Sequence, residues 1–289
     1  MLLLKGRVYS GINNIYRVKD EQGRFFECRI KGKVLQEDKR SYTPLAPGDW
    51  VDMELTGGDK GLILERQERK NSFARWNRKK EMRQTVAANV DLLAAVISVT
   101  APPFRPRFVD RVLINAAQYN VPACIVVNKI DRGMEDWAGP RIRNWQKLGY
   151  RVFQTSVVSG KGLKTLKNAL KGKTAVLFGP SGVGKSSLLN YLVPGAELPV
   201  GEISAKYNRG KHVTNFGRLL DVPGGGYLVD TPGVREILVR GIEPEELTSF
   251  FPEFREWELL CGFSPCSHRH EPDCGVRDAV ESGLINEDR

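Results

Sequence analysis

One glycine-rich stretch constrains the fold of this 289-residue chain more than any other feature. Residues 179–186 read Gly-Pro-Ser-Gly-Val-Gly-Lys-Ser and match G-x-x-x-x-G-K-[ST], the pattern of a phosphate-binding loop. The β-branched run Ala175–Phe178 precedes it and the helical pattern Ser186–Leu192 follows, which is the context that this loop requires. A chance glycine-rich turn would lack that context. The segment therefore predicts a nucleotide-binding α/β domain built on a mostly parallel sheet.

The residue types in this loop suit phosphate chemistry. Its glycines let successive backbone N–H groups face a β-phosphate, and the following helix N-terminus adds partial positive charge. Lys185 is expected to bridge the β- and γ-phosphates, and the Ser186 hydroxyl to ligate Mg²⁺. The expected phosphate-loop contacts are Gly179, Pro180, Ser181, Gly182, Val183, Gly184, Lys185, Ser186 and Ser187.

A second sequence, Asn128-Lys129-Ile130-Asp131, follows the buried-strand pattern Ala123–Val127. Asp131 can accept hydrogen bonds from guanine N1–H and its exocyclic amine, whereas adenine offers an acceptor at N1 and would leave the carboxylate unpaired. We expect Lys129 to lie across the base and Asn128 to tie this loop to the phosphate loop. Ser156 suits a second base-contacting loop, although a generic turn explains it as well.

Two further segments suit contacts to a γ-phosphate. Asp230-Thr231-Pro232-Gly233 ends a strand-like run, so Asp230 is expected to hold Mg²⁺ through a water and the Gly233 N–H to meet the phosphate. In the polar stretch 210–214, Thr214 is expected to coordinate Mg²⁺ only while a γ-phosphate is present. An ordinary loop threonine is the alternative for Thr214.

The catalytic assignment is less direct. Val234 follows Gly233 at the position where many GTPases carry a water-orienting glutamine. An apolar side chain cannot orient water, so we expect slow hydrolysis assisted by His212 or by a partner, with Lys185 and Thr214 as the other catalytic residues. A contact from His212 to phosphate or RNA is an equally good interpretation.

The order of these segments is unusual. The base-contacting sequence at 128–131 precedes the phosphate loop at 179–186, the reverse of the common guanine-nucleotide arrangement. The domain is therefore expected to be circularly permuted, which a fold with nearby surface termini tolerates. Both switch segments then directly precede the C-terminal part, so we hypothesise that loss of the γ-phosphate acts on that part.

Near the C-terminus, three cysteines and a histidine form C-x₄-C-x-H-x₅-C, namely Cys261, Cys266, His268 and Cys274. Three thiolates and an imidazole satisfy a closed tetrahedral zinc site, which stabilises a fold and has no open position for catalysis. Spacing alone does not exclude His270 in place of His268, and unmetallated cysteines are the remaining alternative.

The first 70 residues read as five short strands separated by turns, which suits a small closed barrel of either the OB or the SH3-like type. The following segment, Arg66–Arg83, carries eight basic residues against two acidic ones, with Phe73 and Trp76 interleaved. It either binds single-stranded RNA or is a solvated linker whose aromatic rings dock on a neighbouring domain.

Composition adds two constraints. The chain has 44 lysines and arginines against 34 acidic residues, a net charge of +10, which favours a polyanionic partner. No apolar stretch approaches the ~20 residues needed to cross a bilayer, and no signal-peptide core is visible. We therefore expect a cytoplasmic protein without a membrane partner.

Together these segments resemble one family, the circularly permuted GTPases that depend on the small ribosomal subunit and are named RsgA, YjeQ or YloQ. The resemblance extends over nearly the whole chain and includes the barrel turn Pro47-Gly48-Asp49. It implies an α/β P-loop GTPase domain, circularly permuted with a mostly parallel sheet, an N-terminal all-β OB-fold barrel and a small C-terminal α-helical zinc domain. The implied units are an OB-fold RNA-binding domain at 1–72, a basic linker at 73–85, the GTPase domain at 86–240 and the zinc-binding domain at 241–289.

The resemblance also implies function. A member would hydrolyse GTP to GDP and phosphate with Mg²⁺, carry one structural Zn²⁺, and act as a monomer in late maturation of the small (30S) ribosomal subunit by binding its rRNA. It favours His268 over His270 as the zinc ligand. One departure is that the family commonly has His-Thr-Thr in the first switch, where this chain has His212-Val213-Thr214.

Two other functions remain open at this point. One is a nucleotide-gated protein that binds a different RNA. The other is a P-loop enzyme that uses ATP, such as a kinase, which Asp131 disfavours.

Overall fold

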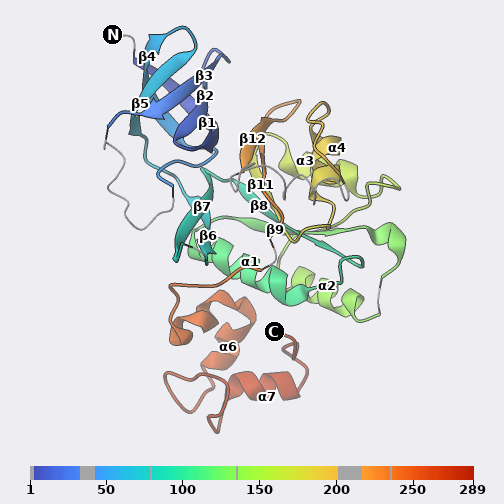
Figure 1. Ribbon diagram of the computed structural model, residues 1–289. Coiled ribbons are helices and arrows are strands. Elements are labelled where there is room, and N and C mark those ends of the chain that lie inside the picture. The colour runs from blue at the N-terminus through green and yellow to red at the C-terminus, as the bar shows by residue number, and fades with distance from the viewer. Residues whose placement is uncertain (1–2, 33–42, 79, 135, 201–216, 235) are drawn as a thin grey trace.

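The computed structural model describes residues 3–32, 43–78, 80–134, 136–200, 217–234 and 236–289. Figure 1 shows three parts in chain order: a barrel, a sheet with helices on both sides, and a small C-terminal part beside α1 and α2. None of the helices within those ranges is long and apolar enough to cross a membrane.

The N-terminal part is a closed five-stranded barrel. Its strands are β1 (Leu3–Ile12), β2 (Ile15–Asp20), β3 (Phe25–Ile30), β4 (Trp50–Gly57) and β5 (Lys60–Arg66). They close in the order β1-β2-β3-β5-β4, and β3–β5 is the parallel pair. Alternate side chains, among them Val8, Val18, Met53 and Ile63, fill the interior and are fully buried. The OB-type barrel is thus confirmed.

The basic segment after the barrel folds as a hairpin rather than a solvated linker. Its strands β6 (Ser72–Asn77) and β7 (Met82–Ala88) pair antiparallel. Phe73 is fully buried and meets the Phe178 ring edge to face, with centroids 5.0 Å apart. Of the two interpretations of this segment, docking of Phe73 on the neighbouring domain is therefore confirmed and stacking of Phe73 on an RNA base is wrong, because burial against the α/β core leaves its ring no exposed face.

A six-stranded sheet forms the centre of the molecule. Its strands are β8 (Leu92–Ser98), β9 (Ala123–Asn128), β10 (Val152–Gln154), β11 (Thr174–Phe178), β12 (Arg218–Asp221) and β13 (Tyr227–Asp230). The order is β10-β9-β8-β11-β13-β12, and every neighbouring pair is parallel except β12–β13. The mostly parallel sheet expected from continuous apolar runs is confirmed.

Helices cover both faces of this sheet, which explains why its strands are apolar on both sides. One face packs against α1 (Pro106–Gln118) and α2 (Ala138–Lys147), and the other against α3 (Leu163–Leu170) and α4 (Lys185–Leu192). Within β8, Leu93 joins the first layer and Ala94 the second. The carboxyl ends of the parallel strands are left as the edge where ligands bind in such folds.

The C-terminal part consists of short helical segments. They are η2 (Pro244–Phe250), η3 (Pro252–Phe254), α6 (Arg255–Glu258) and α7 (Gly275–Glu281). Glu243 caps η2, a 3₁₀ helix, in a capping box with Glu246. The buried side chain of Arg289 joins this part to the sheet domain, since it pairs with Asp110 of α1 and with Glu253.

The barrel is attached to the edge strand β12 by polar contacts. The Tyr9 hydroxyl donates to the Asp221 carboxylate at 2.8 Å, and Lys19 Nζ lies 3.0 Å from the same group. Burial, followed by the hydrogen bond to Asp221, raises the pKa of Tyr9 far above its usual value, so its hydroxyl stays a donor. The Arg7 guanidinium donates to the Thr174 hydroxyl at 2.9 Å and fixes the barrel to β11 as well.

Candidate nucleotide site and metal centre

The phosphate loop lies between β11 and α4, as its sequence pattern predicts. Gly182 and Gly184 adopt positive φ of 83° and 96°, which curls the loop over the start of α4. A Cβ at Gly179 would lie 2.1 Å from the Val96 carbonyl oxygen, so only glycine fits beside β8. The chain therefore forms a loop of closely spaced backbone N–H groups at a helix N-terminus, a geometry that binds phosphate.

Lys185 lies inside this loop. It is 7% exposed, and its Nζ donates to the carbonyl oxygens of Gly179 and Pro180, at 2.8 Å each. Burial lowers the pKa of Lys185 to about 8, while the nearby Asp230 acts in the opposite direction. The loop thus holds a partly destabilised cation that an entering phosphate would stabilise.

Replacing Lys185 by methionine is expected to stabilise the nucleotide-free protein at pH 7, by about 1–3 kcal/mol, because a cation with a lowered pKa is costly to bury. The pKa of this amine falls from 10.5 to about 8 on folding, so the unfolded chain binds the extra proton. Wild-type stability should therefore rise between pH 8 and 10.5, and the advantage of the variant should shrink over that range. Urea unfolding at pH 7 and pH 10 measures both effects, and a larger advantage at pH 10 would contradict this account.

The base-contacting loop is tied to the phosphate loop by side chains from two strand ends. Asn128 Nδ2 donates to the Val183 carbonyl at 2.9 Å, and its Oδ1 accepts from the Thr155 hydroxyl at 3.0 Å. Lys129 adopts φ 63° and its Nζ donates to the carbonyls of Ala101 and Gly182, both at 2.6 Å. The tie expected of Asn128 is present, and Lys129 spans the space between the two loops.

The side chains of Asp131 and Ser156 contact each other next to this loop. The Ser156 hydroxyl donates to the Asp131 carboxylate and accepts from the Ser159 backbone N–H at 3.0 Å. Ser156 is fully buried whereas Asp131 is exposed. Ser156 therefore positions Asp131, and the carboxylate keeps lone pairs to accept hydrogen bonds from a ligand.

Gly184 offers a clean test of the tie between the loops. A Cβ there would lie 2.3 Å from Asn128 Nδ2, so Gly184→Ala must displace the amide as well as strain the backbone. We expect nucleotide affinity to fall at least about tenfold, or ~1.4 kcal/mol. The matched control is Gly195→Ala, where φ is +89° but nothing lies within 4 Å. Calorimetric titration with GDP should show near-normal affinity for the control, and equal losses in both would remove the tie as the cause.

The segment Asp230-Thr231-Pro232-Gly233 packs directly on the phosphate loop. Thr231 Oγ1 donates to the Leu177 carbonyl at 2.7 Å, and a Cβ at Gly233 would lie 2.8 Å from the Ser181 Cα. Burial raises the pKa of Asp230, whereas Arg218 and Lys185 lower it. The Asp230 carboxylate therefore interacts electrostatically with the Lys185 amine of the phosphate loop.

The residue after this segment points elsewhere. Val234 is 4% exposed and belongs to the core on the α1–α2 side of the sheet. It cannot contact an attacking water, in agreement with its apolar character. The other catalytic predictions, His212 and Thr214 in the stretch 210–214, lie outside the described residues.

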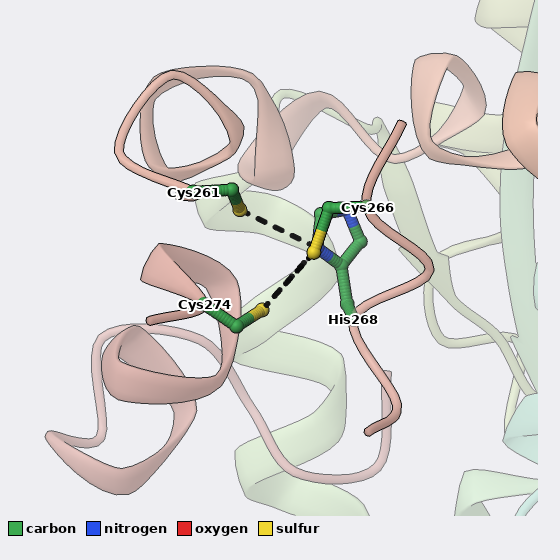
Figure 2. A group of neighbouring side chains, drawn as sticks. All are labelled: Cys261, Cys266, His268 and Cys274. Carbon is green, nitrogen blue, oxygen red and sulfur yellow. Dashed lines mark hydrogen bonds between the residues drawn. The ribbon is translucent and has the colours of Figure 1, made fainter. Parts of the chain in front are cut away.

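Four side chains converge in the C-terminal part (Figure 2). The ligand atoms of Cys261, Cys266, His268 and Cys274 all lie within 4.8 Å of one another. A tetrahedral ion with metal–sulfur bonds of about 2.3 Å and a metal–nitrogen bond of about 2.0 Å separates two sulfurs by about 3.8 Å and a sulfur from a nitrogen by about 3.5 Å.

The observed spacings match that expectation. Cys266 Sγ and Cys274 Sγ are 3.8 Å apart. His268 Nδ1 lies 3.7 Å from Cys261 Sγ and 3.4 Å from Cys274 Sγ. His268 belongs to this group of possible ligands and His270 does not, so the ambiguity between the two histidines is resolved in favour of His268. The donor set fits a structural metal site.

Some contributors to the site escaped sequence reasoning. The Ala101 carbonyl that accepts from Lys129 belongs to a loop without a recognisable pattern, and no motif marks Thr155, which donates to Asn128. Only their positions in the chain could have indicated a role in the site, since both residues follow strands that end at the same edge of the sheet.

Comparison with known proteins agrees with this geometry. The family model for the RsgA N-terminal domain matches residues 5–63, and that for the RsgA GTPase matches residues 66–240. The chain is 38% identical over 290 residues to the small ribosomal subunit biogenesis GTPase RsgA of Bacteroides fragilis, covering 99% of this chain and 94% of the relative. The RsgA of Borreliella afzelii is 38% identical over 285 residues, with 98% and 92% covered.

Two solved structures share the whole architecture. The crystal structure of YjeQ from Thermotoga maritima matches with a TM-score of 0.76 and 33% identity, over 100% of this chain and 95% of that one. The crystal structure of YloQ, described as a circularly permuted GTPase, matches with a TM-score of 0.71 and 27% identity, over 99% and 91%. With its base-contacting loop ahead of its phosphate loop and both joined as described, this chain belongs to the RsgA family of circularly permuted GTPases.

Proposed function

We propose that this chain binds GTP between Asp131 and the phosphate loop and hydrolyses it to GDP and phosphate. The observation that carries this proposal is the pair of contacts from Asn128 and Lys129 to the phosphate loop, at 2.9 and 2.6 Å. These contacts fix the distance between the Asp131 carboxylate and the backbone of the phosphate loop. A bound purine nucleotide must span that distance. Asp131 then selects guanine over adenine and makes an ATP-using enzyme the weaker alternative.

Catalysis in this proposal rests on positioning and charge neutralisation. The backbone of residues 179–184 and the Lys185 amine hold the β- and γ-phosphates, and the Gly233 N–H contacts the γ-phosphate. Ser186, Thr214 and, through a water, Asp230 would hold Mg²⁺, which supplies Lewis-acid stabilisation of the phosphate oxygens when bound. Because Val234 is buried, no side chain at that position orients water, and a slow basal rate is expected unless His212 or a partner supplies this function.

The four-residue Cys/His group is proposed to hold one Zn²⁺ that stabilises the C-terminal part. Its spacings suit a tetrahedral ion, and its set of four donors leaves no open position. A catalytic role for this ion is therefore not proposed.

The partner proposed is the small (30S) ribosomal subunit, contacted through its rRNA in late maturation, with the protein acting as a cytoplasmic monomer. Support comes from the names of the relatives, from the net charge of +10 and from the OB-type barrel. The basic hairpin would contribute phosphate contacts through its cations, although Phe73 cannot stack on bases.

Phosphate release from GTP tests this function, measured for the protein alone, with small subunits and with large subunits at one fixed salt concentration. A slow basal rate that small subunits alone raise at least tenfold is the expected result. Stimulation by free structured RNA to the same extent would favour a different RNA partner. Equal rates in all conditions would rule out activation by the ribosomal subunit.

A further inference from the structure

A cavity of about 740 Å³ lies apart from the nucleotide site, between α1, α2 and the C-terminal residues 286–288. None of the phosphate-loop or base-loop residues lines it. In Figure 1 this region is where the C-terminus approaches α1 and α2, below the sheet. Its volume is in the range of ligand-binding sites.

Cations dominate the lining. Arg107 and Arg111 lie one turn apart on α1, Arg105 directly precedes that helix, and all three are exposed. Across the described residues, no carboxylate lies within ion-pair distance of Arg105 or Arg111. The α1 N-terminus has no side-chain cap, so the partial positive charge of this 13-residue helix points toward the same region.

Arg141 supplies the strongest evidence that the cavity is built for an acceptor. It lines the cavity, is 2% exposed and bonds to Asp110 through Nη2. Its Nε and Nη1 are buried without a hydrogen-bond partner. Leaving buried charged donors unpaired costs free energy, so an acceptor that reached Arg141 from the cavity would stabilise this side chain.

Two carboxylates also line the cavity, and each lies near at least one arginine. Glu236 pairs with Arg78 of the basic hairpin. Asp288 lies 3.7 Å from Arg107 and 3.9 Å from Arg141, too far for hydrogen bonds and close enough only for weak ion pairs. A bound anion would therefore find four guanidinium groups whose pairing with acidic residues is incomplete.

One aromatic ring adds a second kind of contact. Trp137 lines the cavity with 48% of its surface exposed, and its ring meets Phe104 edge to face at a centroid distance of 5.0 Å. A half-exposed indole at the edge of a cavity offers apolar surface on which a base can stack. Arginines around an aromatic platform recognise a phosphate and a base together.

The geometry points to a second nucleotide-phosphate site in this cavity, in which a phosphate lies among Arg107, Arg111 and Arg141 and a base stacks on Trp137. Either a nucleotide unit of a single RNA strand or a free mononucleotide has this chemistry. Glu236 lies three residues after Gly233, so the occupant would sit beside the segment that packs on the phosphate loop. The proposal concerns binding alone and does not depend on GTP hydrolysis.

A ten-nucleotide oligouridylate with a 5′-hydroxyl and one 4-thiouridine tests this site in the full chain with GDP bound, because uracil does not fit the guanine-selective loop. We expect photo-crosslinks in the peptides of α1 and of residues 136–147. Arg111→Ala should weaken binding about five- to tenfold, as loss of one phosphate contact does, and Trp137→Leu by a similar factor. The matched control Arg143→Ala removes the same charge from α2 outside the cavity lining and should change affinity less than about twofold.

Competition by uridine monophosphate identifies the source of the ligand. Displacement of the crosslink at millimolar concentration would indicate a free nucleotide, and persistence of the crosslink would indicate an RNA strand; both support the site. Thermal scans of each variant verify that it is folded. Crosslinks confined to the barrel and hairpin, or equal losses from Arg111→Ala and Arg143→Ala, would overturn the proposal.

Discussion

Asp131→Asn is expected to weaken GTP and GDP binding by about 10²–10³-fold, or ~3–4 kcal/mol, because the charged acceptor of two guanine hydrogen bonds is lost. The asparagine carbonyl can still accept from N1–H, but its amide faces the exocyclic amine, a second donor. Xanthine has a carbonyl at that position, so xanthosine nucleotides should bind the variant better than guanosine nucleotides. Competition against a fluorescent nucleotide measures the reversal of preference.

The control for this variant is Asp59→Asn, which makes the same change on an exposed turn between β4 and β5. It should leave all nucleotide affinities unchanged. In the wild type, ATP should fail to compete. If Asp131→Asn lowers affinity for guanosine and xanthosine nucleotides equally, the residue supports the loop structurally and does not read the base.

Cys266→Ser is expected to reduce bound zinc from about one ion per chain to near zero and to unfold the C-terminal part. The core of this part is small, with Val276, Ala279 and Ile285 beside Cys266 and Cys274. Metal binding supplies about 10–16 kcal/mol in isolated zinc-finger peptides, more than a core of this size provides. Metal analysis of the purified variant and protease sensitivity of residues 241–289 measure the two effects.

Cys124→Ala is the matched control, since it also removes one buried thiol but lies in β9, far from the metal centre in the chain. It should retain its zinc and its C-terminal resistance to protease. A strong chelator should reproduce the Cys266→Ser behaviour in the wild type. Equal zinc content in the two cysteine variants would contradict the assignment of the ligands.

Contacts within the site could be predicted from the sequence where a recognisable motif directly follows a strand of the parallel sheet. Asn128 and the phosphate loop follow strands β9 and β11, which a parallel sheet brings to one edge, so their contact could be expected before the fold was known. The metal centre was similarly visible because all its ligands lie within 14 residues, and local spacing restricts where they can converge.

Contacts between distant segments could not be anticipated in this way. Arg289 donates a hydrogen bond to Asp110, 179 positions away in the chain, and no sequence motif around either residue predicts this contact. For a related reason the sequence could not decide between RNA stacking and domain docking for Phe73, since only the folded hairpin places its ring against Phe178. The contribution of His212 and Thr214 stays a prediction.

The attachment of the barrel to β12 also affects how this protein should be dissected. β12 is the outermost strand of the sheet, and β1 lies against it, with Tyr9 and Lys19 bound to Asp221. Unprotected edge strands offer unpaired backbone groups to other chains and promote aggregation. A fragment that begins after the barrel would uncover this strand, so its insolubility would reveal nothing about RNA binding. The barrel has two proposed roles: it binds a partner, and it covers the edge strand β12. Point variants at Tyr9 or Asp221 weaken its attachment to β12 without removing the barrel and so separate these roles.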